Sequence, residues 1–291
     1  MNLVTGPVVP RRRLAAELRR LRTEAGLTLE AVADELMISR SKLSRLEQGQ
    51  GSPQGRDVRD LIRLYGIENT ELSETMMRWV RAARRQGWWN DYSYTSSGAM
   101  SGMDTHIAYE TEASIARVYT IPFLPALLQT KNYTRALYQS MEPWRDRAEI
   151  DQLVQLRLAR QEHLNEREDA EPLQLVAISH ECCLHQFVGS AEIMREQLHA
   201  LDVCFEQPNM ELRILPFSAP PAFTSTCMFA YFEFGDSLDR DVVHVETHAG
   251  FRHIEATDQV SLYRRHYDDL MRRALPPSDS RHVVRSAVER W

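Results

Sequence analysis

The sequence predicts two domains: an all-α N-terminal domain of five helices and a C-terminal α+β domain with a small sheet flanked by helices. In residues 1–90, apolar side chains recur every three or four positions in five short segments, the spacing of amphipathic helices. Beyond residue 170, short runs rich in branched and aromatic residues alternate with helical segments, which is typical of an α+β domain. A chain of 291 residues is long enough for both domains.

Residues 29–49, LEAVADELMISRSKLSRLEQG, read as two short helices joined by a tight turn. The first helix has apolar residues at i, i+3, i+4 and i+7, namely Leu29, Val32, Ala33 and Leu36. Ser39 suits the N-cap of the second helix, and Gly49 suits the left-handed position after its end.

The second of these helices presents polar and cationic side chains opposite its inward residues, Leu43 and Leu46. Hydroxyls, amides and long cations on one short helix suit base edges and phosphates, so we expect a helix-turn-helix whose second helix enters the major groove. An ordinary helical hairpin with a polar face is the alternative. The predicted base contacts are Arg40, Ser41 and Arg45, and the predicted contacts with phosphate or an adjacent base edge are Lys42 and Ser44.

Three flanking amphipathic segments favour the helix-turn-helix over the hairpin. One precedes it and ends near Gly26, and two follow it, around Leu61 and Met76. This layout, with R-x3-G-L-T-L-x2-V-A at residues 22–33 and S-R-S-K-L-S-R-L-E-x-G at residues 39–49, resembles the phage-repressor and Xre-like helix-turn-helix family. The resemblance implies a repressor-like fold and a structural salt bridge between Arg22 and Glu47.

Charge is divided unevenly along the chain. Residues 1–90 hold 16 Lys and Arg against 11 Asp and Glu, whereas residues 91–291 hold 19 against 30. A basic first domain suits double-stranded DNA, and an acidic second domain suits a protein or ligand. Four cysteines without a C-x-x-C pair, no signal peptide and no long apolar run predict a cytoplasmic protein that does not span a membrane.

We expect a DNA-binding domain at residues 1–87, a hinge or linker at 88–104 and a regulatory and dimerisation domain at 105–291. Trp88 and Trp89 are interpreted as a hinge anchor with one ring on each domain, in preference to stacking on nucleic acid. In the second domain, helices are expected at residues 105–117, 146–164, 193–205, 254–275 and 279–289. Strands are expected at residues 173–178, 211–215, 227–234 and 242–246.

A second resemblance covers residues 105–285. The stretches IPFLPALLQTKNY, RLARQ, GSAEIMREQLHAL, ILPF and VVHVET are similar to the accessory domain behind an Xre-type helix-turn-helix in regulators of sporulating, antibiotic-producing bacteria. The chain departs from that pattern at Ala126, where the family usually has glycine. In several members a small acidic protein encoded nearby acts with the regulator, and some pairs look like toxin–antitoxin systems. That protein is therefore a further expected partner.

The segment from His180 to His185, HECCLH, is the strongest metal candidate, but its spacing suits a strand end with partly buried cysteines better. Neither a glycine-rich phosphate loop nor a hydrolase elbow occurs, so we predict no enzyme, metal or cofactor.

The prediction is a bacterial transcriptional regulator that binds operator DNA as a homodimer, with a small-molecule or protein input at its second domain. Two alternatives stay open: an antitoxin-like protein that mainly binds a small acidic partner and regulates its own operon, and an enzyme gated by DNA binding.

Overall fold

The computed structural model describes residues 6–92, 102–165, 167, 171–221, 227–235, 240–247 and 250–291. The chain divides into two compact units; one ends at Trp88 and the other begins at Trp89. In the described ranges, no helix is long and apolar enough to cross a membrane.

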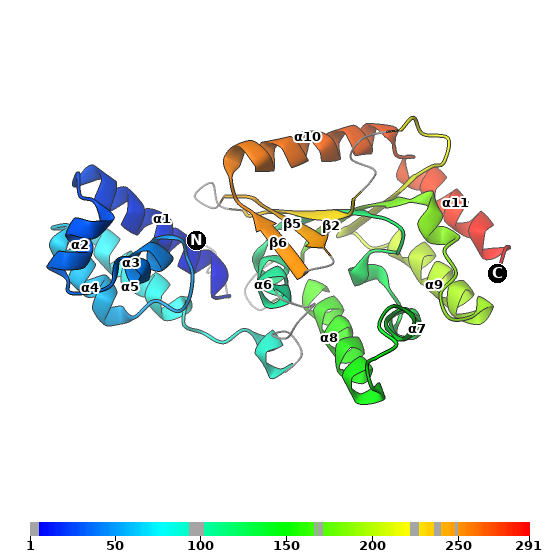
Figure 1. Ribbon diagram of the computed structural model, residues 1–291. Helices are drawn as coiled ribbons and strands as arrows, with labels where there is room; N and C mark the ends of the chain where they lie inside the picture. Colours follow the sequence, from blue (N-terminus) through cyan, green and yellow to red (C-terminus); the bar gives the residue numbers. More distant parts are fainter. Residues whose placement is uncertain are drawn as a thin grey trace. The chain divides into compact units, whose positions relative to one another are not determined.

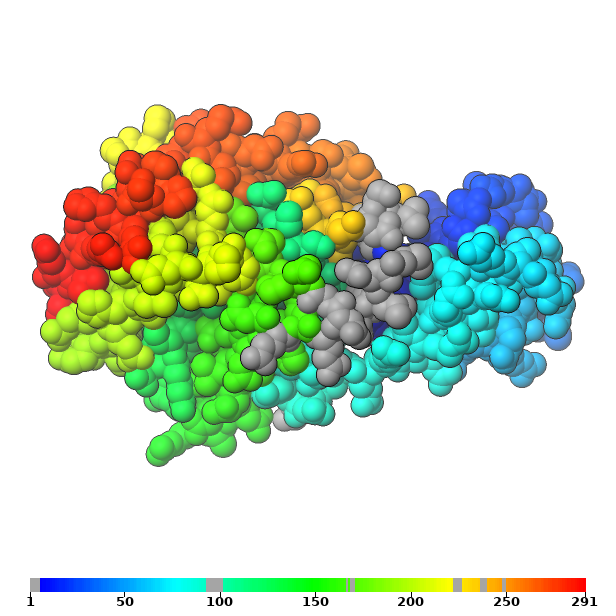
Figure 2. Space-filling view, turned by 180° about the vertical axis from the view of Figure 1, so that it is seen from behind, coloured from blue at the N-terminus to red at the C-terminus, as the bar shows by residue number. Residues whose placement is uncertain are grey.

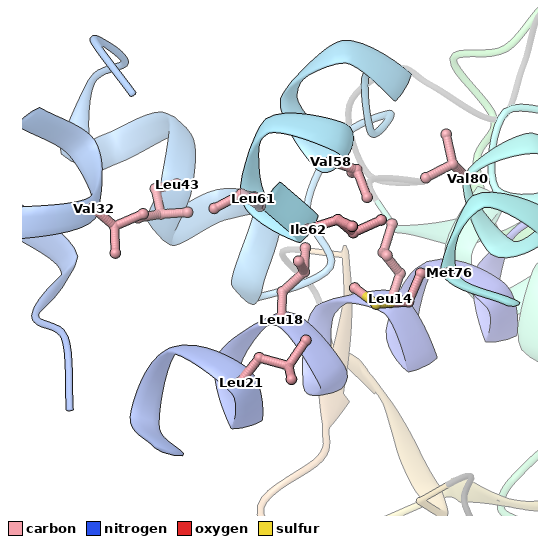
Figure 3. Packing of buried hydrophobic residues seen from close by; sticks show 10 residues of the cluster. All are labelled: Leu14, Leu18, Leu21, Val32, Leu43, Val58, Leu61, Ile62, Met76 and Val80. Atoms are coloured by element: carbon pink, nitrogen blue, oxygen red, sulfur yellow. The ribbon is translucent and has the colours of Figure 1, made fainter. Parts of the chain in front are cut away.

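The first unit is all-α, as predicted. Its helices are α1 (Val8–Glu24), α2 (Leu29–Glu35), α3 (Arg40–Glu47), α4 (Gly55–Leu64) and α5 (Glu71–Ala82). Pro10 lies in the first turn of α1, where proline is tolerated because its missing N–H would have no partner within the helix. One apolar core joins the helices (Figure 3), formed by Leu14, Leu18, Leu21, Val32, Leu43, Val58, Leu61, Ile62, Met76 and Val80.

Four of these helices end in the same backbone motif. After α3, Gly49 N–H donates to Leu46 O at 3.2 Å and Gln50 N–H donates to Arg45 O at 2.8 Å, a Schellman motif. Gly49 has φ +68°, the left-handed conformation that its position requires. The same pair of bonds closes α1 and α4, where glycine also occupies the left-handed position, and it closes α2, where Met37 occupies that position with φ +50°.

The second unit contains a six-stranded mixed sheet. Its strands are β1 (Ile115–Thr120), β2 (Gln174–His180), β3 (Met210–Leu215), β4 (Phe229–Glu233), β5 (Val242–Thr247) and β6 (Gly250–Ile254). The strand order is β3-β2-β1-β4-β5-β6. β1 is central: it runs parallel to β2, with Tyr119 opposite Ile178, and antiparallel to β4, with Tyr119 opposite Phe229. The sheet is therefore parallel on one side of β1 and antiparallel on the other.

Helices cover both faces of this sheet (Figure 1). α10 (Thr257–Arg273) lies on one face, where Tyr267 and Leu270 pack with Tyr119, Ile178 and Phe229. α6 (Met103–Glu112) and α8 (Arg147–Asn165) lie on the other face, with α7 (Lys131–Met141) beside α8. α9 (Ala191–Cys204) and α11 (Pro277–Val288) run side by side near β3; Figure 2 shows the pair in yellow-green and red.

The predicted α+β class is confirmed, but two strands were missed. Residues 105–117 were expected to be one helix, whereas α6 ends at Glu112 and Arg117 lies in β1. Strand pairing on both sides overrides the local helical pattern, and Arg117 is neutralised by Glu233 of the neighbouring β4. Ile254 was expected to begin a helix, but it ends β6, which pairs with β5.

The linker prediction falls largely on residues that the structure does not describe. Most of the expected linker, residues 93–101, lies outside the described ranges. Trp88 and Trp89 begin a short 3-10 helix, η1 (Trp88–Asp91), in which Trp89 is buried. Their role as a hinge anchor stays a prediction.

Candidate nucleic-acid interface

Side-chain caps define the starts of both helices in residues 29–49. Thr28 Oγ1 accepts the Ala31 N–H at 3.1 Å before α2, and Ser39 Oγ accepts the Lys42 N–H at 3.1 Å before α3. Each cap satisfies an N–H that has no partner within its helix. The chain between the helices is a tight turn through Met37 and Ile38.

The two faces of α3 differ as the pattern predicts. Leu43 is fully buried and Leu46 packs against the same core. The opposite face is solvent-facing: Arg40, Ser41, Arg45 and Gln48 are exposed, and Lys42 and Ser44 are partly exposed. All five proposed DNA-contacting side chains therefore lie on one short helix with accessible surface.

These side chains differ in how they are held. Arg40 Nε lies 2.9 Å from Glu30 Oε1, and Lys42 Nζ lies 2.7 Å from Asp57 Oδ2 of α4. Ser44 Oγ accepts the side-chain N–H of Gln48 at 2.9 Å. Within the described residues, Arg45 has neither an ion-pair partner nor a side-chain hydrogen bond. Of the three cations of α3, Arg45 can approach a ligand without first breaking a contact inside the domain.

Arg22 and Glu47 fasten α1 to α3. Arg22 Nε and Nη2 donate to the two Glu47 carboxylate oxygens at 2.7 and 2.9 Å, and Nη1 donates to Leu27 O at 2.9 Å. The side chains are only 14% and 4% exposed. Hydrogen bonding to Glu47 raises the pKa of Arg22 further above its ordinary value. The pair lies at the end of α3 and fixes how that helix sits on α1.

Met37 is a surface residue that the sequence analysis did not single out. It is 93% exposed, immediately before the cap of α3, and it holds the left-handed conformation usually given to glycine. The sequence could have indicated Met37, because it is an apolar residue at the turn position where α1, α3 and α4 have glycine.

The second unit brings together polar residues from two distant stretches, PALLQT and RLARQ. Arg157 Nη1 donates to Gln129 Oε1 at 2.6 Å, and Gln161 Nε2 donates to Gln129 O at 2.7 Å. Arg160 Nε and Nη2 donate to the Glu110 carboxylate at 2.9 and 2.7 Å. Burial alone would raise the pKa of Glu110, but the adjacent Arg160 guanidinium holds it well below its usual range.

Three histidines pack beside this network. The His106 and His244 ring centroids lie 3.9 Å apart, and those of His244 and His253 lie 5.1 Å apart. Burial lowers the pKa of all three, so the rings are neutral at pH 7. In the metal candidate segment from His180 to His185, His180 Nδ1 accepts the Cys182 N–H at 3.2 Å. Among the residues described, no group of three or more His, Cys, Asp or Glu is placed to hold a metal ion.

Comparison with known families assigns both halves of the chain. Residues 103–286, more than half of the sequence, match the family model described as a domain of unknown function, DUF5753. The chain belongs to this family. Residues 13–74 match the model of a helix-turn-helix domain, which includes Arg22, Glu47 and all of α3.

The DUF5753 match begins at Met103, the first residue of α6, and includes the buried Arg157 and Arg160 network. No curated protein matches the chain significantly. No solved structure matches it either.

Proposed function

We propose that the chain is a cytoplasmic transcriptional regulator of the Xre type that binds operator DNA as a homodimer through α3. The observation that carries this proposal is the outward face of α3 in a helix-turn-helix domain, with Arg45 exposed and unpaired within the described part of the chain. A free guanidinium on such a helix suits the O6 and N7 acceptors of guanine in the major groove. The proposal assigns no reaction to the chain.

The proposed DNA contacts of α3 fall into base contacts and phosphate contacts, according to how firmly each side chain is held within the domain. Arg45, Arg40 and Ser41 are proposed to read base edges; Arg40 leaves only an exposed ion pair, which is worth less than about 1 kcal/mol. Lys42 is proposed to contact phosphate, together with Ser44. Asp57 is only 13% exposed and holds Lys42 toward α4, which suits a cation that positions the helix more than one that reads a base.

The charge distribution supports the division of labour between the domains. Residues 1–90 carry a net charge of +5 and residues 91–291 a net charge of −11. DNA affinity comes largely from counterion release at phosphates, which requires a basic surface. The acidic DUF5753 domain is proposed to supply dimerisation and a regulatory input.

The test compares Arg45→Ala with Lys42→Ala on selected operator DNA and on random DNA. We expect Arg45→Ala to lose about 1–3 kcal/mol of discrimination while keeping its non-specific affinity. Lys42→Ala should weaken binding to all sequences and lower the salt slope by about one unit. Arg78→Ala, an exposed arginine on α5, is the control and should leave discrimination unchanged. Equal effects of Arg45→Ala and Lys42→Ala on discrimination and salt slope would refute the assignment of roles.

Sedimentation equilibrium tests the dimer, because a lone helix-turn-helix binds weakly and regulators of this kind pair on two half-sites. We expect a homodimer at micromolar concentration. A monomer with and without DNA would contradict it. One-to-one co-purification of a small acidic protein would instead favour the antitoxin-like function.

A further inference from the structure

The second unit contains a partly open cavity of about 190 Å³ between the sheet and the helices of one face. Its walls come from α6, α7, α8, the short helix η4 (Ala126–Leu128) and the facing strands β1, β4 and β5. Every lining residue belongs to the second unit.

Small side chains on two central strands create this space. Ala116 of β1 lies opposite Phe232 of β4, and Ala230 of β4 lies opposite Val118 of β1. All four line the cavity. Side chains usually fill the interior of a domain, so a pocket of this size with a mostly apolar lining suits the binding of a small molecule.

Most of the wall is apolar, but Arg157 supplies a buried cation. The residue is 7% exposed, and its described acceptors are all neutral: Gln129 Oε1 at 2.6 Å, Tyr138 Oη at 2.8 Å and Ala126 O at 3.3 Å. Within the described ranges, no carboxylate lies within ion-pair distance of Arg157. Arg160 lies one helical turn along α8 in the same wall. In contrast to Arg157, it forms an ion pair, with Glu110 at 2.7 Å.

The carboxylates and His244 in the cavity wall do not supply a counter-charge to Arg157. Glu110 is bound by Arg160, and Glu142 pairs with Arg145. Glu246 is near enough to interact electrostatically with Arg157, but its side chain is exposed and lies outside ion-pair distance of Arg157. His244 is neutral because burial lowers its pKa well below the ordinary value.

We propose that this cavity binds a small, largely apolar molecule bearing one carboxylate, with the carboxylate on Arg157 and the apolar body against Ala116, Ala230 and Phe232. A buried guanidinium gains most from an anionic acceptor, and the alanines leave room for the body of the ligand. This proposal gives a chemical class to the input of the proposed regulator and rests on that function only for its biological role.

Calorimetric titration of the full chain tests the proposal without DNA. The probes are octanoate and phenylpropanoate, with 1-octanol and phenylpropanol as matched alcohols and acetate as a carboxylate without an apolar body. We expect at least one of the two apolar carboxylates to bind with a negative heat-capacity change, about tenfold or more tighter than its alcohol. Acetate should show no binding.

Three variants localise the site. Arg157→Gln should abolish the preference for carboxylate over alcohol. Ala230→Leu, which adds volume to the cavity wall on β4 and leaves the Arg157 side chain unchanged, should weaken both classes by about tenfold or more. Arg147→Gln, an exposed arginine on the same helix, should change neither. If Arg157→Gln fails to fold, Ala230→Leu and the acid–alcohol pairs still decide the matter.

Three results would overturn the proposal. Equal affinity for acid and alcohol in the native chain would remove the carboxylate from the ligand class. Failure of both apolar carboxylates to bind, or binding that Ala230→Leu leaves intact, would remove the cavity as the site. None of these results bears on DNA binding by α3, so the two proposals fail separately.

Discussion

The two units each bury a bidentate arginine–glutamate pair, but in different surroundings. Arg22–Glu47 lies at the rim of an apolar helical core and joins α1 to α3, the helix that we propose to bind DNA. Arg160–Glu110 lies inside its domain, 3% and 8% exposed, beside neutral histidines and a cavity. In the first unit, the side chains proposed to contact DNA lie on an outer face, and the interior holds this face in place. The second unit keeps charge inside, beside the cavity that we propose to bind a carboxylate.

The largest expected effect comes from breaking the inner pair. Glu110→Gln should lower the free energy of unfolding of the second unit by about 3–5 kcal/mol, because it leaves a buried guanidinium without its counter-charge. Urea unfolding followed by circular dichroism measures the loss. The double variant Glu110→Met with Arg160→Met should recover most of it, since no charge is then stranded. A loss below about 1 kcal/mol in the single variant would erase the contrast between the two pairs.

The next largest difference between the two units should be in how their stability depends on pH. All ten histidines lie beyond residue 90, and burial lowers the pKa of His106 and His244. Their rings stay neutral when folded, whereas the unfolded chain takes up protons below about pH 6.5. The stability they provide is thus complete above pH 6.5 and is lost as the pH falls toward the folded pKa values.

Two such rings reduce the stability of the second unit by up to about 3 kcal/mol per pH unit below pH 6.5. The first unit should show no such slope. Unfolding curves between pH 7.5 and about pH 5 test this, and His244→Phe should reduce the slope. His199→Gln, an exposed histidine on α9, should not. Parallel acid sensitivity in both units would contradict the comparison.

A smaller effect is expected at the outer pair. Glu47→Gln should cost the first unit about 1.5–3 kcal/mol, because Arg22 is 14% exposed and keeps its bond to Leu27 O. Operator affinity should fall with stability, since the orientation of α3 loosens. Glu30→Gln is the matched control, because its ion pair with Arg40 is exposed and worth little. Equal losses of stability in the two variants would show that the Arg22–Glu47 pair contributes no more than an exposed ion pair.

The smallest effect is a gain in stability. Met37→Gly should stabilise the first unit by about 1 kcal/mol, because a side chain in the left-handed conformation costs about 1–2 kcal/mol and glycine gives back part of that in unfolded-state entropy. Thermal unfolding measures the change. Gly66→Ala reverses the exchange at the end of α4, where φ is +68°, and should destabilise by a similar amount. If DNA affinity falls while stability rises, the exposed methionine contributes to binding.

Sequence reasoning reached further in the first unit than in the second. The first unit is built from local signals: a stripe of apolar residues, a capping serine and a closing glycine define α3 within eleven residues, 39–49. The relative position of Arg22 and Glu47 came from the family resemblance, because periodicity alone does not show which helices touch.

The second unit depends on pairings between distant segments, and these were only partly predictable. β2, β3, β4 and β5 follow runs of branched and aromatic residues and were expected, whereas β1 has Arg117 in the middle and directly follows a helix. The buried role of Arg157 and Arg160 was also missed, because arginine on a helix usually marks a solvated face. Their spacing between leucines in RLARQ was the available signal.

The central position of β1 has a consequence for synthesis on the ribosome. The first unit has every core residue once Val80 has emerged, so it can fold while translation continues. β1 emerges soon afterwards, but its neighbours β2 and β4 end only at His180 and Glu233. During that interval a nascent chain carries a complete helix-turn-helix domain and an unpaired strand that can pair with other chains. If the first unit binds DNA as proposed, a polypeptide released early would bind DNA without the proposed regulatory domain, so expression of this protein should depend on uninterrupted translation of its second half.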